Sequence, residues 1–148
     1  MSRARPRPVA LRVLSILLPV ALVAFVGLVF YQQVERAPSR EQIVGSGPNE
    51  LRVQLWMSPD PPKTGTIPLE VRLATRAGTP VQVDRVLVAY GEEGKETAAP
   101  GETVRQADGA YRASASFTAV GDWWVEVTVM SGPLRMTARF PVRVAPSI

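Results

Sequence analysis

Few side chains in this chain of 148 residues could take part in chemistry, because it contains neither histidine nor cysteine. It therefore cannot form a Ser-His-Asp triad, a cysteine nucleophile, a zinc site with histidine ligands or a covalent c-type haem attachment. No other catalytic constellation is evident in the sequence. We predict that the protein is not an enzyme and that it needs no cofactor.

Methionine sulfur is the one soft metal ligand that the chain offers away from its N-terminus, at Met57, Met130 and Met136. Thioethers alone can hold Cu(I). Scattered methionines more often fill gaps in a hydrophobic core, and Met136 has the core-facing parity of Leu134 and Ala138 in an alternating segment. We predict no metal site and keep the three methionines only as weak copper candidates.

Two adjacent tryptophans, Trp123 and Trp124, begin a segment in which apolar and polar residues alternate. Neighbouring side chains of a strand point to opposite faces. Trp123 has the parity of Val125 and Val127 and is expected in the core, whereas Trp124 has the parity of Glu126 and is expected to point outward. Trp124 then either lies across a neighbouring strand and covers the stem of an arginine or lysine, or anchors a protein partner.

A row of basic residues follows on the last alternating segment, where Arg135, Thr137 and Arg139 share one face and Arg143 continues it. Basic residues on an edge strand commonly prevent unwanted strand pairing. Alternatively, the row could meet an acidic partner or lipid headgroups, in which case salt would weaken binding. Together with Trp124, the three arginines are the candidate partner-binding residues.

Basic charge is concentrated near the N-terminus. Residues 1–40 hold six of the 17 lysines and arginines and one acidic residue, whereas residues 41–148 hold 11 basic and 12 acidic residues. The larger part of the chain is close to neutral, which gives no reason to expect nucleic-acid binding.

Residues 13–31 contain no charged side chain. A helix of these nineteen residues would be about 28 Å long, close to the roughly 30 Å of a bilayer core. The segment predicts one transmembrane helix, in which Ala21, Ala24 and Gly27 could pack against other membrane helices. A cleaved signal peptide is the rival interpretation, but its apolar stretch is about 7 to 15 residues long and ends at a small-x-small site, which FYQQVERAPS lacks.

Four arginines precede this helix, in residues 1–12. By the positive-inside rule they place this N-terminal arm in the cytoplasm and everything after the helix outside it. We therefore predict a single-pass protein of the cell (inner) membrane with an extracytoplasmic C-terminal domain.

Residues 32–50 are polar and contain two prolines and two glycines, the composition of a linker. In residues 51–148, apolar and polar side chains then alternate in seven short segments bounded by turn residues. The segments are 51–55, 69–74, 81–90, 103–106, 111–117, 123–129 and 134–140. This pattern predicts an all-β domain: an immunoglobulin-like antiparallel β-sandwich of about seven strands.

The C-terminal half also carries a specific pattern: Gly109 and Tyr111 in a G-x-Y turn, then Phe117, then Gly121 and Trp123 in a G-x-W strand start. This pattern resembles the FixH-like and YtkA-like domains. The proline-rich turn in residues 56–65 and the turn at residues 78–81 resemble the usual opening of that family, so the resemblance covers roughly residues 51–144. It implies an extracytoplasmic immunoglobulin-like domain on a single membrane helix, associated with bacterial respiratory or copper-handling membrane systems.

The resemblance and the lack of catalytic groups together suggest two functions. The first is a non-catalytic accessory or assembly subunit of a larger respiratory or electron-transfer membrane complex, which acts through protein contacts; FixH-like proteins are linked to the assembly of haem-copper oxidases. The alternative is a membrane-tethered carrier of copper or a small ligand, of the YtkA-like type. Some related domains bind copper through histidine and methionine, and this chain has no histidine.

Overall fold

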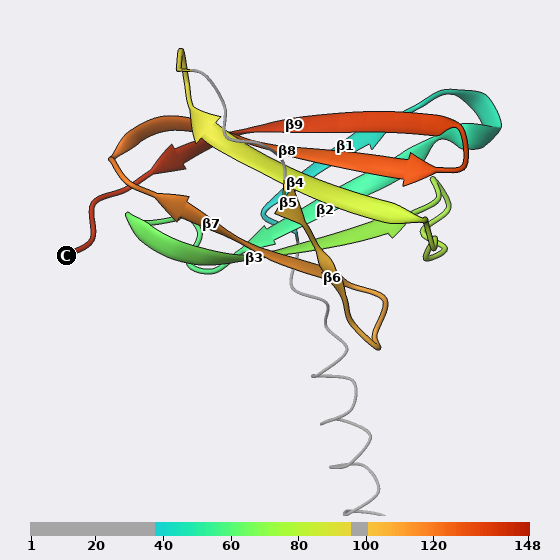
Figure 1. Ribbon diagram of the computed structural model, residues 1–148, viewed down its shortest axis with the longest axis horizontal. Helices are drawn as coiled ribbons and strands as arrows, with labels where there is room; N and C mark the ends of the chain where they lie inside the picture. The colour runs from blue at the N-terminus through green and yellow to red at the C-terminus, as the bar shows by residue number, and fades with distance from the viewer. Residues whose placement is uncertain (1–37, 96–100) are drawn as a thin grey trace, which may run out of the picture. The chain divides into compact units, whose positions relative to one another are not determined.

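The described part of the chain forms nine strands in two antiparallel sheets, most of them with alternating apolar and polar residues (Figure 1). The computed structural model describes residues 38–95 and 101–148. The strands are β1 (Arg40–Val44), β2 (Leu51–Met57), β3 (Gly65–Ala74), β4 (Arg85–Glu92), β5 (Gly101–Glu102), β6 (Val104–Arg105), β7 (Tyr111–Phe117), β8 (Gly121–Ser131) and β9 (Leu134–Val144). The prediction of an all-β antiparallel sandwich is confirmed.

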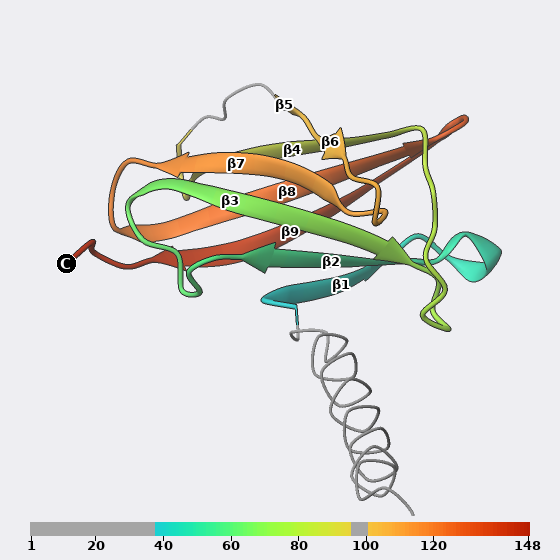
Figure 2. The same ribbon diagram turned by 90° about the horizontal axis from the view of Figure 1, so that it is seen from below.

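One sheet has the strand order β1-β2-β3-β7-β6 and the other has the order β5-β4-β8-β9. Figure 2 shows the two sheets as two layers, with β3 and β7 in front of β4 and β8. At one side of the sandwich β1 lies near β9, where the Arg40 Nε donates a hydrogen bond of 3.5 Å to the Pro141 carbonyl. At the other side the chain crosses from β5 in one sheet to β6 in the other through Thr103.

The core lies between the sheets and is built by the inward parity of each strand. Val53, Leu55, Val71 and Val127 are fully buried there, as the alternation predicts. Trp123 joins this core, with its ring edge-on to Phe117 at a centroid distance of 5.3 Å and its indole nitrogen donating to the Ala119 carbonyl at 2.9 Å. The core position predicted for Trp123 is confirmed.

Several boundaries differ from the prediction: β3 begins at Gly65 and not at residue 69, β4 covers Arg85–Glu92 in place of residues 81–90, and β2, β8 and β9 extend beyond their predicted segments. The predicted linker, residues 32–50, contains β1 and a short 3-10 helix, η1 (Gly47–Asn49). Only Val44 of β1 is buried, so this edge strand shows no alternation, and its backbone pairing with β2 defines it. The predicted segment at residues 103–106 contains only the short strand β6, and a second short strand, β5, precedes it in the other sheet because the chain changes sheets at Thr103.

Several predictions fall on residues that the structure does not describe. The N-terminal arm, the transmembrane segment 13–31 and its packing residues Ala21, Ala24 and Gly27 lie outside the described ranges. Within residues 38–95 and 101–148, no helix is long and apolar enough to cross a membrane.

Candidate functional site

Trp124 lies on the outer face of the β5-β4-β8-β9 sheet, where it is 3% exposed. Beneath its ring is Gly91, its partner across the β4–β8 pair. A Cβ atom added to Gly91 would lie 2.6 Å from Cζ2 of Trp124, so the ring fits only because this residue has no side chain. A glycine inside a strand often marks such a close approach.

Arg139 also contacts the Trp124 ring. Its guanidinium carbon lies 4.3 Å from the ring centroid, within the range of a cation–π interaction. In register, Arg139 of β9 is opposite Glu126 and diagonal to Trp124. The arginine therefore reaches along the sheet to the aromatic ring.

The structure corrects the expected exposure of Trp124 and supports one of its two interpretations. Its outward orientation is as predicted, but the indole is covered by Gly91 and Arg139 and offers almost no surface of its own. Parity fixes the face on which a side chain lies, whereas exposure depends on its cross-strand neighbours. Trp124 is thus a platform that holds Arg139.

The basic row on β9 divides into paired and unpaired arginines. Arg143 forms an ion pair of 3.1 Å with Asp122 on β8. Arg135 and Arg139 form no ion pair with any acidic group in the described ranges. Glu126, although opposite Arg139, likewise has no ion pair among the described residues. This face therefore presents charges that its own side chains leave uncompensated.

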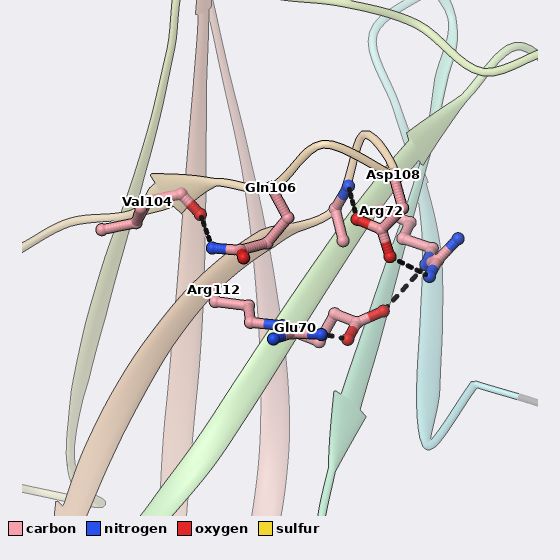
Figure 3. Close-up of polar contacts among 7 residues, drawn as sticks. Glu70, Arg72, Val104, Gln106, Asp108 and Arg112 are labelled. Atoms are coloured by element: carbon pink, nitrogen blue, oxygen red, sulfur yellow. Dashed lines mark hydrogen bonds and ion pairs between the residues drawn. The ribbon is translucent and has the colours of Figure 1, made fainter.

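The outer face of the other sheet has the opposite character (Figure 3). Glu70 contacts Arg72 at 2.8 Å and Arg112 at 3.7 Å, and Arg72 also reaches Asp108 at 3.2 Å. Arg72 lies over Trp56 as well, with its guanidinium carbon 5.9 Å from the ring centroid. The two faces share an arginine above a tryptophan, but here the arginine is held by two carboxylates.

Sequence reasoning did not single out Trp56 or Gly91, although both carried a signal. Trp56 lies between Leu55 and Met57, which have core parity, so alternation alone places it on the outer face with Gln54. Gly91 follows the apolar run of β4 as its penultimate residue, and a glycine within a strand weakens the pairing unless a neighbour needs the space. Their partners, Arg72 and Arg139, follow only from the strand register.

The three candidate copper ligands are not brought together. Met57 is in the core at the end of β2. Met136 lies against Gly45, beyond the opposite end of β2, so the two backbone positions are separated by about six residues, or roughly 20 Å. Met130 is on the outer face of β8, paired with Arg85 and Arg135.

Two clefts open on either side of the crossover from β5 to β6. The smaller, of about 260 Å³, is lined by several polar side chains, and most of them are engaged within the fold. Asp84 accepts a hydrogen bond from the Gly132 amide, Arg85 pairs with Glu102, and Thr103 donates to the Val86 carbonyl. The described residues contain no group of three or more acidic, histidine or cysteine side chains placed to hold a metal ion.

Comparison with known proteins identifies a family and gives one structural likeness. The family model for YtkA-like domains matches residues 45–128, which is more than half of the chain. No curated protein matches significantly. Among solved structures, the crystal structure of an engineered protein is similar over 65% of this chain and 20% of that chain, with 14% sequence identity and a TM-score of 0.43.

Proposed function

Because the chain belongs to the YtkA-like family, we propose that it is a membrane-anchored accessory or assembly subunit of a larger bacterial respiratory or electron-transfer membrane complex. It has no catalytic role and acts through protein contacts of an extracytoplasmic sandwich. The sandwich is of immunoglobulin type, which two antiparallel sheets over a shared apolar core support. Residues 13–31 anchor it, with Ala21, Ala24 and Gly27 packed against helices of the complex.

The observation that carries this proposal is the unpaired Arg139 held on Trp124. Arginine is enriched among the residues that dominate binding energies, partly because its planar group makes several contacts at once. A long side chain usually loses rotamer freedom when it binds, at a cost of about 0.5–1.5 kcal/mol. Stacking on a buried indole removes part of that cost in advance. Arg139 is therefore prepared for a contact that the domain itself does not make.

The partner surface on this account is acidic. Arg135 and Arg139 are four residues apart on β9 and therefore lie on the same face of the strand. Neither has a carboxylate partner in the described part of the chain. Cationic groups without partners contribute most to binding when the opposing surface presents carboxylates. On the outer face of the other sheet, Arg72 and Arg112 already form ion pairs with carboxylates of the domain, so an acidic partner would add less binding energy there.

Charge reversal tests this proposal in the full chain, extracted from its native membranes with a mild detergent. Wild type is expected to copurify with a larger membrane complex. The double variant Arg135→Glu and Arg139→Glu should lose most of that complex, whereas the matched variant Arg76→Glu, on an exposed loop beside the other sheet, should retain it. Migration of the wild type as a lone monomer would count against the proposal.

The alternative function, a carrier of copper or a small ligand, has less support. Its three candidate sulfurs do not converge on one point, and Asp84, Arg85 and Thr103 of the smaller cleft are engaged by neighbouring groups. Binding sites for small ligands normally have a few polar groups that converge on the ligand. A contact function fits the charged face more directly.

A further inference from the structure

Strand β7 is paired along only part of its outer edge, as is β4, which pairs with β5 at Leu87 and Val88 alone. Strand β7 pairs with β3 along its whole length, from Tyr111 to Phe117. On its other side it pairs with β6 at Tyr111 and Arg112 only. Residues 113–117 therefore have no strand beside them on that side among the described parts of the chain (Figures 1 and 2).

This edge lacks the features that usually protect a strand from pairing. Charged side chains, proline and short length are the common protections. Strand β9 has three outward arginines and Pro141, and β1 is five residues long with Arg40 and Glu41. Residues 113–117 are Ala-Ser-Ala-Ser-Phe, without a charge or a proline. The unprotected edge is about 17 Å long and offers two or three outward-facing N–H and C=O pairs, because alternate residues of a strand face each neighbour.

A cleft runs beside this edge. It has a volume of about 480 Å³ and is lined by Val88 and Tyr90 of β4, by Val104 of β6, and by Ala113 and Ser114 of β7. Val104 is 67% exposed, unusual for a valine in a strand. The two charged groups at the cleft, Glu102 and Arg112, already have ion-pair partners in Arg85 and Glu70.

We propose that residues 113–117 of β7 are a strand-addition site, which binds an extended and uncharged segment of a partner polypeptide. The backbone of that segment would complete the hydrogen bonds of β7, in line with β6, and its alternate side chains would enter the cleft. The segment is uncharged because the edge is neutral and a charged side chain would lose water there without gaining a partner. This site is separate from the arginines of β9 and does not depend on them.

A peptide selection on the full chain in nanodiscs tests the site. The probe is a phage-displayed library of random peptides of about eight residues, long enough to form a strand. Enriched peptides are expected to slow hydrogen exchange of the outward amides in residues 113–117 by at least about tenfold, since those amides become hydrogen-bonded. The same peptides with a central proline should fail to do so, because proline lacks the N–H group.

Lysine variants on β7 and on β9 test whether the peptides bind at the edge of β7. Ser114→Lys and Ser116→Lys place charges on the exposed side of the edge and should weaken peptide binding at least about tenfold. Thr137→Lys, an equally exposed position on β9, should leave binding unchanged. Circular dichroism checks that all three variants are folded, and amide protection of the wild type decides the question if a lysine variant unfolds.

Three results would overturn the proposal. In the first, no enriched peptide protects residues 113–117. In the second, these amides are already protected in the free chain at every concentration, which means that the chain covers its own edge. In the third, protection grows with protein concentration in the absence of peptide, which identifies the occupant as a second copy of this chain.

Discussion

The guanidinium carbon of Arg139 lies 4.3 Å above the ring of Trp124, and the ring in turn lies against Gly91. This stack joins three strands of one sheet, because Gly91 is in β4, Trp124 in β8 and Arg139 in β9. A buried aromatic side chain thereby fixes the position of an exposed charge.

The space above Gly91 should be essential to the stack. Gly91→Ala places a methyl group 2.6 Å from Cζ2 of Trp124 and should lower the free energy of unfolding by about 1–3 kcal/mol. Gly101→Ala is the control, since its nearest non-neighbouring atom would be 3.9 Å away. Denaturant unfolding of the full chain in detergent, followed by circular dichroism, measures both. Equal stability of the two variants would contradict the described packing.

Truncation of Trp124 should lower the stability of the domain considerably, even though this residue lies outside the main core. Trp124→Ala removes a buried indole and should reduce the free energy of unfolding by about 3 kcal/mol. A double-mutant cycle with Arg139→Ala should give a coupling of about 0.5–1 kcal/mol, as expected for a partly exposed cation–π pair. A coupling of zero, measured by the same unfolding experiment, would mean that the two side chains are independent.

The sequence predicted the face on which a side chain lies better than it predicted the residues that contact that side chain. Alternation placed Trp123 in the core and Trp124 on the outer face, because side-chain direction in a strand has a period of two residues. It did not predict that Gly91 and Arg139 bury Trp124, since this depends on which strands pair and in what register. Strand β1 was missed for a related reason: with Val44 alone buried, its sequence carries no periodic signal.

Function was less accessible from the sequence than fold. The basic row on β9 was visible as alternating arginines, but its division into Arg143, paired with Asp122, and the unpaired Arg135 and Arg139 needed three-dimensional contacts. The unpaired edge of β7 was also invisible, because it results from the late start of β6 at Val104, where the chain arrives from the other sheet. Both features are produced by long-range pairing, which local patterns do not encode.

Binding of the partner complex should depend on salt. Exposed charges are screened over about 8 Å at physiological ionic strength and over shorter distances as salt increases. The fraction of complex retained on the immobilised chain should therefore fall with added salt, and the fall should be less steep for Arg135→Gln combined with Arg139→Gln. Arg76→Gln should behave as wild type. Salt-independent retention of the wild type would exclude an acidic partner surface.

Copper should not bind stoichiometrically to the methionines. Met57 and Met136 lie near opposite ends of β2, and Met130, although adjacent to the cross-strand partner of Met136, is on the outer face of its sheet, so the three sulfurs do not converge. Titration of the full chain with Cu(I) against a competing chelator should show no uptake above that of the triple variant with leucine at these positions. If the wild type bound one equivalent of Cu(I) and the triple variant bound none, the result would support the carrier function instead.

Photocrosslinking in intact membranes tests the central claim most directly. A photoreactive amino acid is placed at Arg135 or Arg139, and at Gln54 or Arg76 near the opposite outer face as controls. The proposed function predicts crosslinks from positions 135 and 139 to one or a few subunits of a membrane complex, and few from positions 54 and 76. Equal crosslinking from all four positions, or none from 135 and 139, would contradict a contact function for this face.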